Sequence, residues 1–296
     1  MKQLDPKQKI LEPFAGSGQI VRLMTEAGYE QNWSLFDRDE SLAEVTHQDT
    51  ISDFPDGFQA AITNPPYLSF HFAKRKGLKP TKSYFGGYDS LYQTAIEAAL
   101  AGSEYVAMII PESFITSGLF TDRLQSVISL PFAMFDDTDM PTCLALWGAV
   151  NESDFQIWRG DDLLGLASRL IETPISTACR SRIHFNIPEG NLGLRAIDNS
   201  ASASIWFCEP EQIPIERVKH SARLLTRIRV DGLDEPARLI GLANQKINNW
   251  RNLTQDVCLT AFKGLRKDGR FRRRLDYANA RALLSQALCE LEGHSH

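Results

Sequence analysis

Short apolar runs that stop at a small or polar residue recur along the first half of the chain. Residues 10–11, 33–36 and 60–62 are too short for helices and predict buried strands, and 105–110 predicts a longer one. Apolar residues at helical spacing follow the first run, in residues 20–24. Strands that alternate with helices predict an α/β domain with a mostly parallel sheet.

The pattern changes near residue 150. We expect a strand at 153–158, the start of a short helix at 161–164, and short strands and loops in 172–210, which is rich in Ser, Asn and Gly. Three amphipathic helices are then predicted, at 214–230, 235–252 and 278–291. Because 296 residues exceed the usual size of one domain, we expect two, 1–150 and 151–296.

Composition places the chain among globular proteins, with 43% hydrophobic and 23% charged residues. No apolar run approaches the roughly 18 residues of a membrane helix, and the first residues lack the apolar core of a signal peptide. We therefore expect a cytoplasmic protein without a membrane partner. The five cysteines are scattered, with no Cys-x-x-Cys pair, so neither a zinc site nor a disulfide framework is expected. They are expected to be small buried residues.

Charge is segregated along the chain, although the net charge is only −5. Residues 68–88 contain basic residues and no acid, and residues 263–274 contain seven basic residues and one acid. Such segments can form a phosphate-binding face on an acidic protein, or they can simply be solvated. The candidate phosphate contacts are Lys74, Arg75, Lys76, Arg270, Arg272 and Arg273.

A glycine-bearing turn follows the first predicted strand. Its residues are Glu12, Pro13, Phe14, Ala15, Gly16, Ser17 and Gly18. Glycines at such a turn let a ligand approach the backbone closely. The turn is not Gly-x-Gly-x-x-Gly, so the pyrophosphate of a dinucleotide is not its natural ligand. A carboxylate at Glu12 would repel phosphate and attract an ammonium group.

Two more acids follow the next strands. Asp37 lies 21 positions after Gly16, the spacing at which an acid after the second strand reaches ribose hydroxyls, with Asp39 as an alternative. Asp49 follows a third short strand. Together with Glu12, these acids describe a pocket for an adenosine that carries a cationic amino-acid tail.

The sequence Asn64-Pro65-Pro66-Tyr67 follows the predicted strand at 60–62. In open α/β sheets, ligands bind beyond the carboxyl ends of the strands. Two prolines stiffen the backbone and remove two donors, which leaves the Asn64 side-chain oxygen and the Pro65 carbonyl as acceptors. Two acceptors beside the Tyr67 ring suit a planar base with an exocyclic amino group. An ordinary strand-to-loop turn would look the same.

In combination these motifs resemble a known family. Residues 11–18 resemble the cofactor motif of class I S-adenosylmethionine-dependent methyltransferases, and residues 64–67 resemble the catalytic motif of amino-group DNA methyltransferases. The motif order is that of the gamma class, which methylates adenine N6. The resemblance covers about residues 8–150. It implies a Rossmann-like, mostly parallel sheet with an antiparallel last hairpin, and a mixed, helix-rich target-recognition region in residues 151–296.

The resemblance also implies roles for individual residues. Glu12 would hold the methionine end of S-adenosylmethionine, Asp37 the ribose hydroxyls and Asp49 the adenine. Tyr67 would stack on a flipped adenine in double-stranded DNA, and Phe135 is the candidate for its opposite face. The family's upstream cofactor element with a Thr-Pro turn is not seen here, so the methionine end is held less fully or the C-terminal part supplies the missing element.

Several alternatives remain open. The same catalytic motif occurs in RNA adenine or guanine methyltransferases and in protein glutamine methyltransferases, and a non-catalytic DNA-binding protein could keep the fold. A cytosine-C5 mechanism is rejected because the nearest cysteine in sequence, Cys143, is far from the catalytic strand. The transfer needs no metal. A cognate restriction endonuclease system is an expected partner.

Residues 70–87 are expected to form a mobile basic loop with Gly86 and Gly87 as a hinge. Because this loop directly follows the catalytic motif, we predict that it becomes ordered on DNA. Hydrogen exchange of its amides should slow when duplex DNA is added, and unchanged exchange would contradict the prediction.

Overall fold

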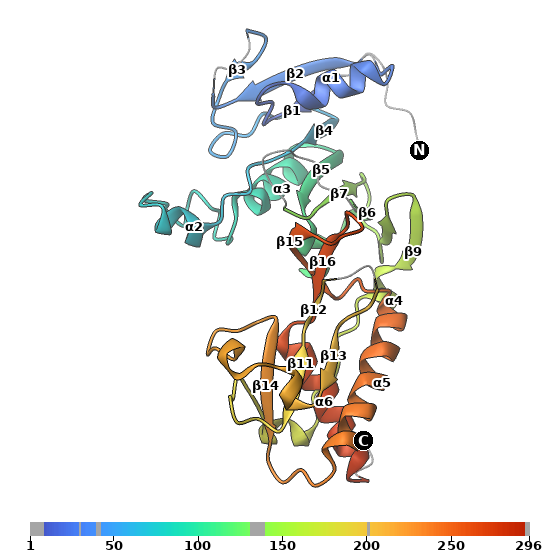
Figure 1. Cartoon of the computed structure of the whole chain (residues 1–296). Helices are drawn as coiled ribbons and strands as arrows, with labels where there is room; N and C mark the ends of the chain where they lie inside the picture. The colour runs from blue at the N-terminus through green and yellow to red at the C-terminus, as the bar shows by residue number, and fades with distance from the viewer. Residues whose placement is uncertain (1–8, 30, 40–42, 131–139, 200–201, 294–296) are drawn as a thin grey trace. The chain divides into compact units, whose positions relative to one another are not determined.

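The computed structural model describes residues 9–29, 31–39, 43–130, 140–199 and 202–293 (Figure 1). The chain divides into two compact units. Unit 1 includes the chain up to Leu130 together with Thr142–Leu164, and unit 2 includes the chain from Gly165 onward. Each unit is described by itself.

Unit 1 is built on a nine-stranded sheet, and the last strand of this sheet ends in the first residues of unit 2. Its strands are β1 (Lys9–Glu12), β2 (Asn32–Asp37), β3 (Thr46–His47), β4 (Ala60–Thr63), β5 (Tyr105–Pro111), β6 (Leu124–Ser129), β7 (Thr142–Trp147), β8 (Gln156–Arg159) and β9 (Asp162–Leu166). Their order is β3-β2-β1-β4-β5-β7-β6-β8-β9. Strands β1 to β5 pair in parallel, whereas β7 is antiparallel to both β5 and β6.

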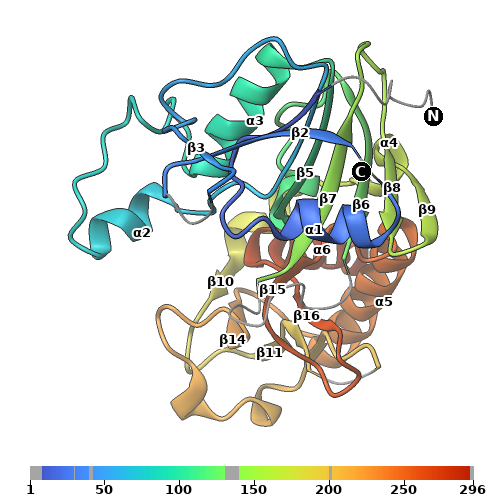
Figure 2. The same ribbon diagram turned by 90° about the horizontal axis from the view of Figure 1, so that it is seen from above.

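The strand order reverses between β1 and β4. From β1 the chain moves to β2 on one side, and from β4 it moves to β5 on the other. Right-handed crossovers in opposite directions place the intervening helices α1 (Gln19–Glu26) and α3 (Leu91–Gly102) on opposite faces of the sheet (Figure 2). The carboxyl ends of β1 and β4 therefore meet at the point where open α/β sheets bind ligands. This order and the antiparallel β7 confirm the predicted class I methyltransferase architecture.

Local sequence explains where the helices of unit 1 begin. Gly18 precedes α1 with a positive φ of 72°, a conformation that glycine adopts without steric cost. Ser90 and Gln93 form a capping box at the start of α3. Ser69 caps α2 (Phe70–Arg75) by accepting a hydrogen bond from the Phe72 amide. The expectation of a loop throughout residues 70–87 is therefore wrong at its start. A 3-10 helix, η1 (Glu112–Thr116), follows β5.

Unit 2 is a mixed, helix-rich region, as predicted. One sheet has the order β10 (Ile183–Phe185), β14 (Leu225–Val230), β11 (Leu192–Arg195) and β13 (Trp206–Cys208), and a second has β12 (Ile197–Asp198), β16 (Phe271–Arg274) and β15 (Thr260–Leu265). Its helices are α4 (Ala167–Leu170), α5 (Pro236–Thr254) and α6 (Tyr277–Leu291), with the 3-10 helices η2 (Ala178–Arg182), η3 (Pro210–Gln212) and η4 (Ile215–Arg217). The predicted helices at 235–252 and 278–291 are confirmed.

The unit 2 core gathers one face of each long helix. On α5, Leu239, Ala243, Ile247 and Trp250 are buried at intervals of three and four residues. They pack in one cluster with Leu192 and other strand residues and with the buried face of α6. This packing fixes the helices against the four-stranded sheet.

Two predicted helices of the C-terminal half are wrong. Residues 214–230 contain η4 and the strand β14, in which Thr226, Ile228 and Val230 are buried in alternation. Alternation places these side chains on the core face of a strand. Residues 161–164 belong to β9, and the next helix begins only at Ala167. The strand expected at 153–158 is present as β8 (Gln156–Arg159).

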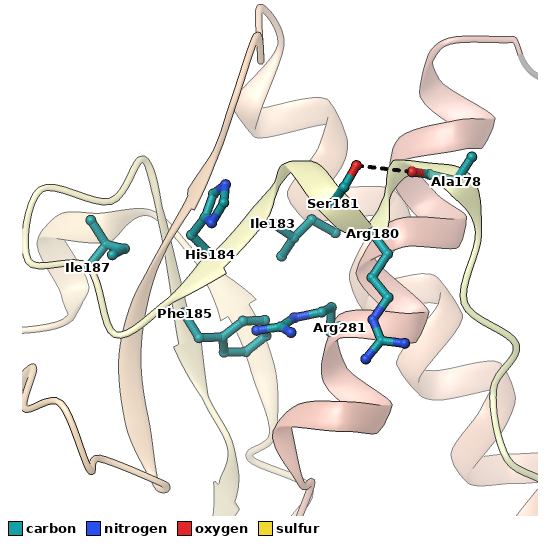
Figure 3. Close-up of a pocket in the computed structure, with 8 residues that line it drawn as sticks. All are labelled: Ala178, Arg180, Ser181, Ile183, His184, Phe185, Ile187 and Arg281. Atoms are coloured by element: carbon teal, nitrogen blue, oxygen red, sulfur yellow. Dashed lines mark hydrogen bonds between the residues drawn. The ribbon is translucent and has the colours of Figure 1, made fainter.

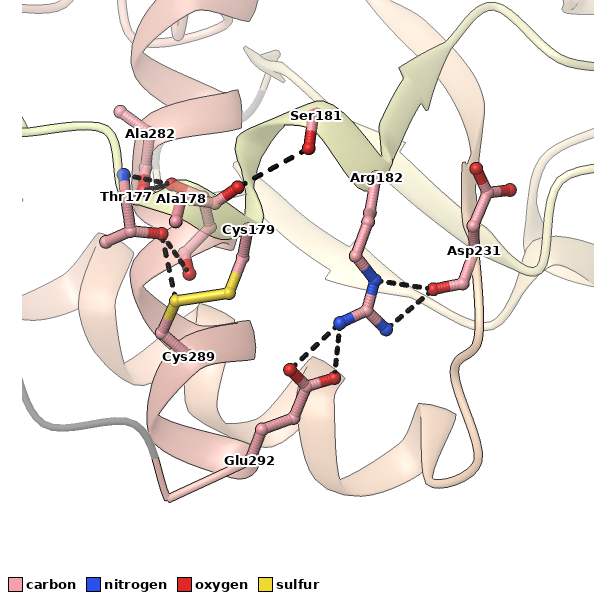
Figure 4. The surroundings of a disulfide bond; sticks show 10 residues. Thr177, Ala178, Cys179, Ser181, Arg182, Asp231, Ala282, Cys289 and Glu292 are labelled. Atoms are coloured by element: carbon pink, nitrogen blue, oxygen red, sulfur yellow. Dashed lines mark hydrogen bonds and ion pairs between the residues drawn. A yellow bond between two sulfur atoms is a disulfide. The ribbon is translucent and has the colours of Figure 1, made fainter.

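The segment η2 and β10 lies beside α6 in unit 2 (Figure 3). A disulfide joins Cys179 of η2 to Cys289 of α6, with 6.2 Å between their Cα atoms (Figure 4). The expectation that no disulfide forms is therefore wrong, because the two cysteines are 110 positions apart and only the fold brings them together. Cys143 and Cys208 are free and buried, as expected.

Candidate active site

Glu12 ends β1 and is almost fully buried, with 1% of its surface exposed. The Thr63 hydroxyl, at the end of the neighbouring β4, donates a hydrogen bond to Glu12 Oε1. Glu12 Oε2 has no hydrogen-bond partner among the described residues. Burial raises the pKa of Glu12 to about 8, although the hydrogen bonds from Thr63 and the Phe14 backbone oppose that rise. At neutral pH the folded chain therefore keeps Glu12 protonated, and a cationic donor at Oε2 would favour release of that proton.

Contacts from neighbouring strand ends hold the glycine turn in place. The Gly16 amide donates to Asp37 Oδ2 at 2.7 Å, and the Ala15 amide donates to the Phe36 carbonyl at 2.9 Å. The Thr50 hydroxyl donates to the Pro13 carbonyl at 2.7 Å. The end of β2 and the segment after β3 are thus tied to the turn that follows β1.

Asp37 ends β2 and is partly exposed. Besides the Gly16 amide, its carboxylate accepts the Asp39 amide at 2.9 Å through Oδ1. A carboxylate can accept about four hydrogen bonds, so acceptor sites remain for hydroxyl donors. Asp39, the alternative acid, supplies its amide to Asp37.

Asp49 lies two residues after β3 and has a partner that sequence reasoning missed. The Tyr84 hydroxyl approaches both carboxylate oxygens of Asp49, at 3.1 and 3.2 Å. The Ile51 amide and the Ser52 hydroxyl also donate to this carboxylate, each at 3.2 Å. Tyr84 belongs to the basic segment at 70–87, so that segment contacts a predicted cofactor residue directly. Tyr84 and Asp49 are 35 positions apart, so no local sequence pattern predicts their contact.

The stiff corner after β4 carries the predicted catalytic residues. Asn64 Oδ1 accepts a hydrogen bond from the Tyr67 hydroxyl at 2.6 Å, and the Ile109 carbonyl lies 2.8 Å from the same hydroxyl. A phenol has one hydrogen, so it donates to one of these acceptors at a time. Burial raises the pKa of Tyr67 above its ordinary value, which keeps the hydroxyl protonated.

The Tyr67 ring packs edge-on against Tyr92, with ring centroids 6.5 Å apart. This contact fixes the ring plane beside the corner. Its predicted stacking on a base stays a prediction. Phe135, the candidate for the opposite face of the base, lies outside the described residues.

The basic residues of α2 and of its C-terminal cap are exposed and lie beside the buried Phe70 ring or the exposed Phe72 ring. Lys74 lies 4.7 Å from the Phe70 ring centroid, and Arg75 and Lys76 lie 5.9 and 5.6 Å from that of Phe72. Phe70 also packs with the buried Phe85 and Leu91, which anchors α2 to unit 1. Cations beside rings suit the phosphates and bases of a nucleic acid.

The second basic segment belongs to unit 2. Arg272 and Arg273 lie on β16, and Arg270 is exposed just before it. In the turn that joins β15 to β16, Arg266 pairs with Asp268 at 2.6 Å. These arginines are therefore displayed on an antiparallel ribbon, and their predicted contact with phosphate stays a prediction.

Residues 8–129 match the family of Eco57I restriction-modification methylases. This match confirms the family resemblance drawn from the sequence over those residues. No curated protein matches the chain. No helix among the described residues is long and apolar enough to cross a membrane.

Solved structures offer only distant likenesses. The methyltransferase subunit of a type I restriction-modification system from Streptococcus thermophilus is 15% identical, with 52% of this chain and 42% of that chain covered and a TM-score of 0.39. The M protein of the type I restriction enzyme EcoKI is 8% identical, with 98% and 67% covered and a TM-score of 0.37. The type IIG restriction endonuclease BpuSI is 15% identical, with 53% and 24% covered and a TM-score of 0.39.

This chain spans less than two thirds of the length of the first solved structures it matches, from 41% to 60%. At these TM-scores the likenesses carry no argument about activity. The assignment of the fold rests on the strand order of this chain.

Proposed function

We propose that this chain transfers a methyl group from S-adenosylmethionine to adenine N6 in double-stranded DNA. The observation that carries the proposal is the junction of β1 and β4. There, a buried acid with an unused oxygen, Glu12, lies on the strand next to the one that leads into the Asn64-Pro65 acceptors. The match to a restriction-modification methylase family supports the same reaction class.

The acids at the strand ends fit the proposed cofactor. Glu12 Oε2, buried and without a partner among the described residues, would accept the ammonium of the methionine end. Remaining acceptor sites on Asp37 would hold the ribose hydroxyls, and Asp49 would accept the adenine amino group. The turn Pro13, Phe14, Ala15, Gly16 and Gly18 would bring backbone close to the cofactor. When bound, the cofactor supplies an electrophilic methyl group.

Asn64 and Pro65 would activate the substrate nitrogen. The lone pair of adenine N6 is delocalised into the ring and is a poor nucleophile. If the Asn64 side-chain oxygen and the Pro65 carbonyl accept both amino hydrogens, the nitrogen moves toward tetrahedral geometry and its lone pair becomes localised. The same two acceptors stabilise the positive charge that arrives on nitrogen as the methyl bond forms. Holding the two reactants in line supplies much of the remaining acceleration.

The Tyr67 hydroxyl would have to release Asn64 before the base binds. In the structure it donates toward Asn64 Oδ1, and the Ile109 carbonyl is an alternative acceptor at 2.8 Å. Turning the hydroxyl to Ile109 frees one lone pair of Asn64 without leaving the phenol unpaired. The rigid Pro66 keeps the acceptors in place during this exchange.

The target nitrogen lies inside a duplex, so the base would be flipped out at a cost of a few kcal/mol. Stacking on Tyr67 could return about 1–3 kcal/mol, with Phe135 proposed for the opposite face. Residues 1–150 would then be the catalytic domain and 151–296 the target-recognition region. The basic residues of α2 and of β16 and its turn would contact phosphates. We propose a cytoplasmic role beside a cognate restriction endonuclease system.

A methyl-label experiment tests this proposal against its rivals. The full chain is incubated with S-adenosylmethionine labelled in its methyl group and, in separate reactions, with plasmid DNA, cellular RNA and cellular protein. We expect label in DNA alone, released as N6-methyldeoxyadenosine after digestion to nucleosides. Label confined to RNA or protein would overturn the choice of substrate, and label in none of them would overturn the proposed activity.

A further inference from the structure

Unit 2 contains a cavity of about 640 Å³ between η2, β10 and α6 (Figure 3). Arg180 and Ser181 of η2, His184 and Phe185 of β10 and Arg281 of α6 are among the residues that line it. Its volume lies in the range of small-molecule sites, from about 300 to 1,000 Å³. None of these residues belongs to the predicted catalytic or basic segments.

Two arginines in this cavity lack a carboxylate partner. Among the described residues, neither Arg180 nor Arg281 forms an ion pair within 4.0 Å, and Arg281 Nε is buried without a hydrogen-bond acceptor. Burial lowers the pKa of Arg281, and the nearby charge of Arg180 lowers it further. Arg281 is half-buried and Arg180 is exposed, so the charge of Arg281 is the one that is partly withdrawn from water.

Unlike Arg180 and Arg281, the other basic residues near the cavity form ion pairs with acids. Arg182 binds Glu292 at 2.6 Å and the Asp231 carbonyl (Figure 4). Asp231 in turn pairs with His184 Nε2 at 2.9 Å and with Arg229 at 3.1 Å. The acids beside the cavity already have basic partners, so Arg180 and Arg281 are available to an external anion.

A ring orients the Arg281 guanidinium, and a disulfide holds the backbone next to Arg180. The Arg281 guanidinium lies over the Phe185 ring, 5.0 Å from its centroid, and Phe185 packs on Tyr277 at 4.8 Å. Arg180 directly follows Cys179, whose disulfide to Cys289 ties η2 to the helix that carries Arg281. Because the Phe185 ring already places Arg281, this side chain loses little entropy when a ligand binds.

We propose that Arg180 and Arg281 form a phosphate-binding site in unit 2 whose ligand is a phosphodiester of nucleic acid. Guanidinium groups match phosphate oxygens by paired, charge-assisted hydrogen bonds. The cavity is larger than one phosphate and leaves room for the adjoining sugar beside Phe185. The choice of a DNA phosphate rests on the proposed function, whereas the phosphate chemistry of the site does not.

The salt dependence of DNA binding tests the site. We would measure the Kd of a duplex oligonucleotide at several salt concentrations for wild type, Arg180→Gln and Arg281→Gln. Each variant should bind about tenfold more weakly at low salt, and the slope of log affinity against log salt should fall by about 1. Arg238→Gln, an exposed arginine of unit 2 that faces Glu235, is the matched control and should change neither quantity. Equal thermal unfolding of all variants shows that the fold is kept.

A second titration separates the sources of phosphate. Inorganic pyrophosphate should bind wild type and should bind Arg281→Gln at least about tenfold more weakly. Pyrophosphate binding that needs Arg281, combined with an unchanged DNA slope, would overturn DNA as the ligand. Unchanged DNA binding in both variants, together with unchanged pyrophosphate binding in Arg281→Gln, would overturn the site.

Methyl transfer by the wild type is scored separately, because it tests the proposed activity and not this site. Transfer to DNA with unchanged slopes in both variants would defeat this inference alone. Reduced slopes without any methyl transfer would support the site and leave the proposed activity as the part that failed.

Discussion

Burial strongly raises the pKa of the Glu12 side chain. Its folded pKa is about 8, against an ordinary value of 4.5. Between these values the unfolded chain has released the proton and the folded chain has kept it, so the folded state binds more protons. Stability that is fully present below pH 4.5 is therefore lost as the pH rises toward 8.

Replacing Glu12 by Gln should remove this pH dependence. A pKa difference of about 3.5 units corresponds to about 5 kcal/mol. Relative to wild type, Glu12→Gln should gain stability as the pH rises from 5 to 8. Denaturant unfolding at several pH values measures the difference between the two proteins. A difference that stays constant with pH would show that Glu12 is not protonated at neutral pH in the folded chain.

The sequence placed three of the candidate residues at strand ends because each comes at the end of a short apolar run. Glu12 and Asp37 end β1 and β2, Asn64 directly follows β4, and Asp49 lies two residues after β3, while the roles of all four stay predictions. It could not reveal the groups that hold them. Thr63 lies 51 positions from Glu12, and Tyr84 lies 35 positions from Asp49, and local periodicity carries no information about such contacts.

At the scale of elements, the segment from α2 to α3 contains the exposed basic residues of α2 and also contacts Asp49, the acid proposed to bind the adenine of the cofactor. This segment is anchored by a buried cluster of Phe70, Phe85 and Leu91, and Ile51 and Tyr84 pack against that cluster. Ile51 follows Asp49 by two residues. A movement of this segment is therefore expected to shift Asp49, the acid that is proposed to bind adenine. Binding of DNA and binding of cofactor are thus expected to influence each other, and any such coupling is reciprocal.

Removing the Tyr84 hydroxyl tests this connection. A hydrogen bond to a charged group contributes about 1.5–3 kcal/mol, and loss of the part that orients Asp49 should weaken S-adenosylmethionine binding by about tenfold in Tyr84→Phe. Titration calorimetry measures this loss. Tyr88→Phe, which removes a hydroxyl bound to the exposed Glu97, is the matched control and should bind the cofactor like wild type. Equal affinity in Tyr84→Phe would show that Asp49 needs no orientation from this segment.

Element types were predicted best where one period dominated. The apolar stripe of α5 recurs every three or four residues over its whole length, and the predicted helix there is correct. Residues 225–230 alternate over only six positions, and their neighbours in η4 obscured the strand period. A short apolar run fits either element until its sheet partners are known, and β10 and β11 are those partners.

At the scale of the whole molecule, one covalent bond closes most of unit 2. The Cys179–Cys289 disulfide spans 110 positions, and cross-linking a loop of that size restricts the unfolded chain strongly. Such bonds persist in oxidising surroundings and are uncommon in the cytosol, so unit 2 is expected to have a different stability in its reduced form.

Reduction should therefore destabilise unit 2. Loss of the bond by dithiothreitol or by Cys289→Ser is expected to lower its free energy of unfolding by about 4 kcal/mol. Denaturant unfolding with and without reductant measures this change. Cys258→Ser should remain sensitive to reductant, whereas Cys289→Ser should not respond to it. Equal stability of the oxidised and reduced wild type would contradict a bond between these cysteines.

The central claim is that Asn64 activates an amino group for methylation. The most direct measurement compares wild type, Asn64→Ala and the exposed control Asn151→Ala for transfer of labelled methyl to duplex DNA and for S-adenosylmethionine binding. Removing one acceptor of the developing charge should lower transfer by Asn64→Ala at least about 100-fold, with cofactor affinity kept within about threefold, and should leave Asn151→Ala unaffected. Transfer by Asn64→Ala at the wild-type rate would contradict the account.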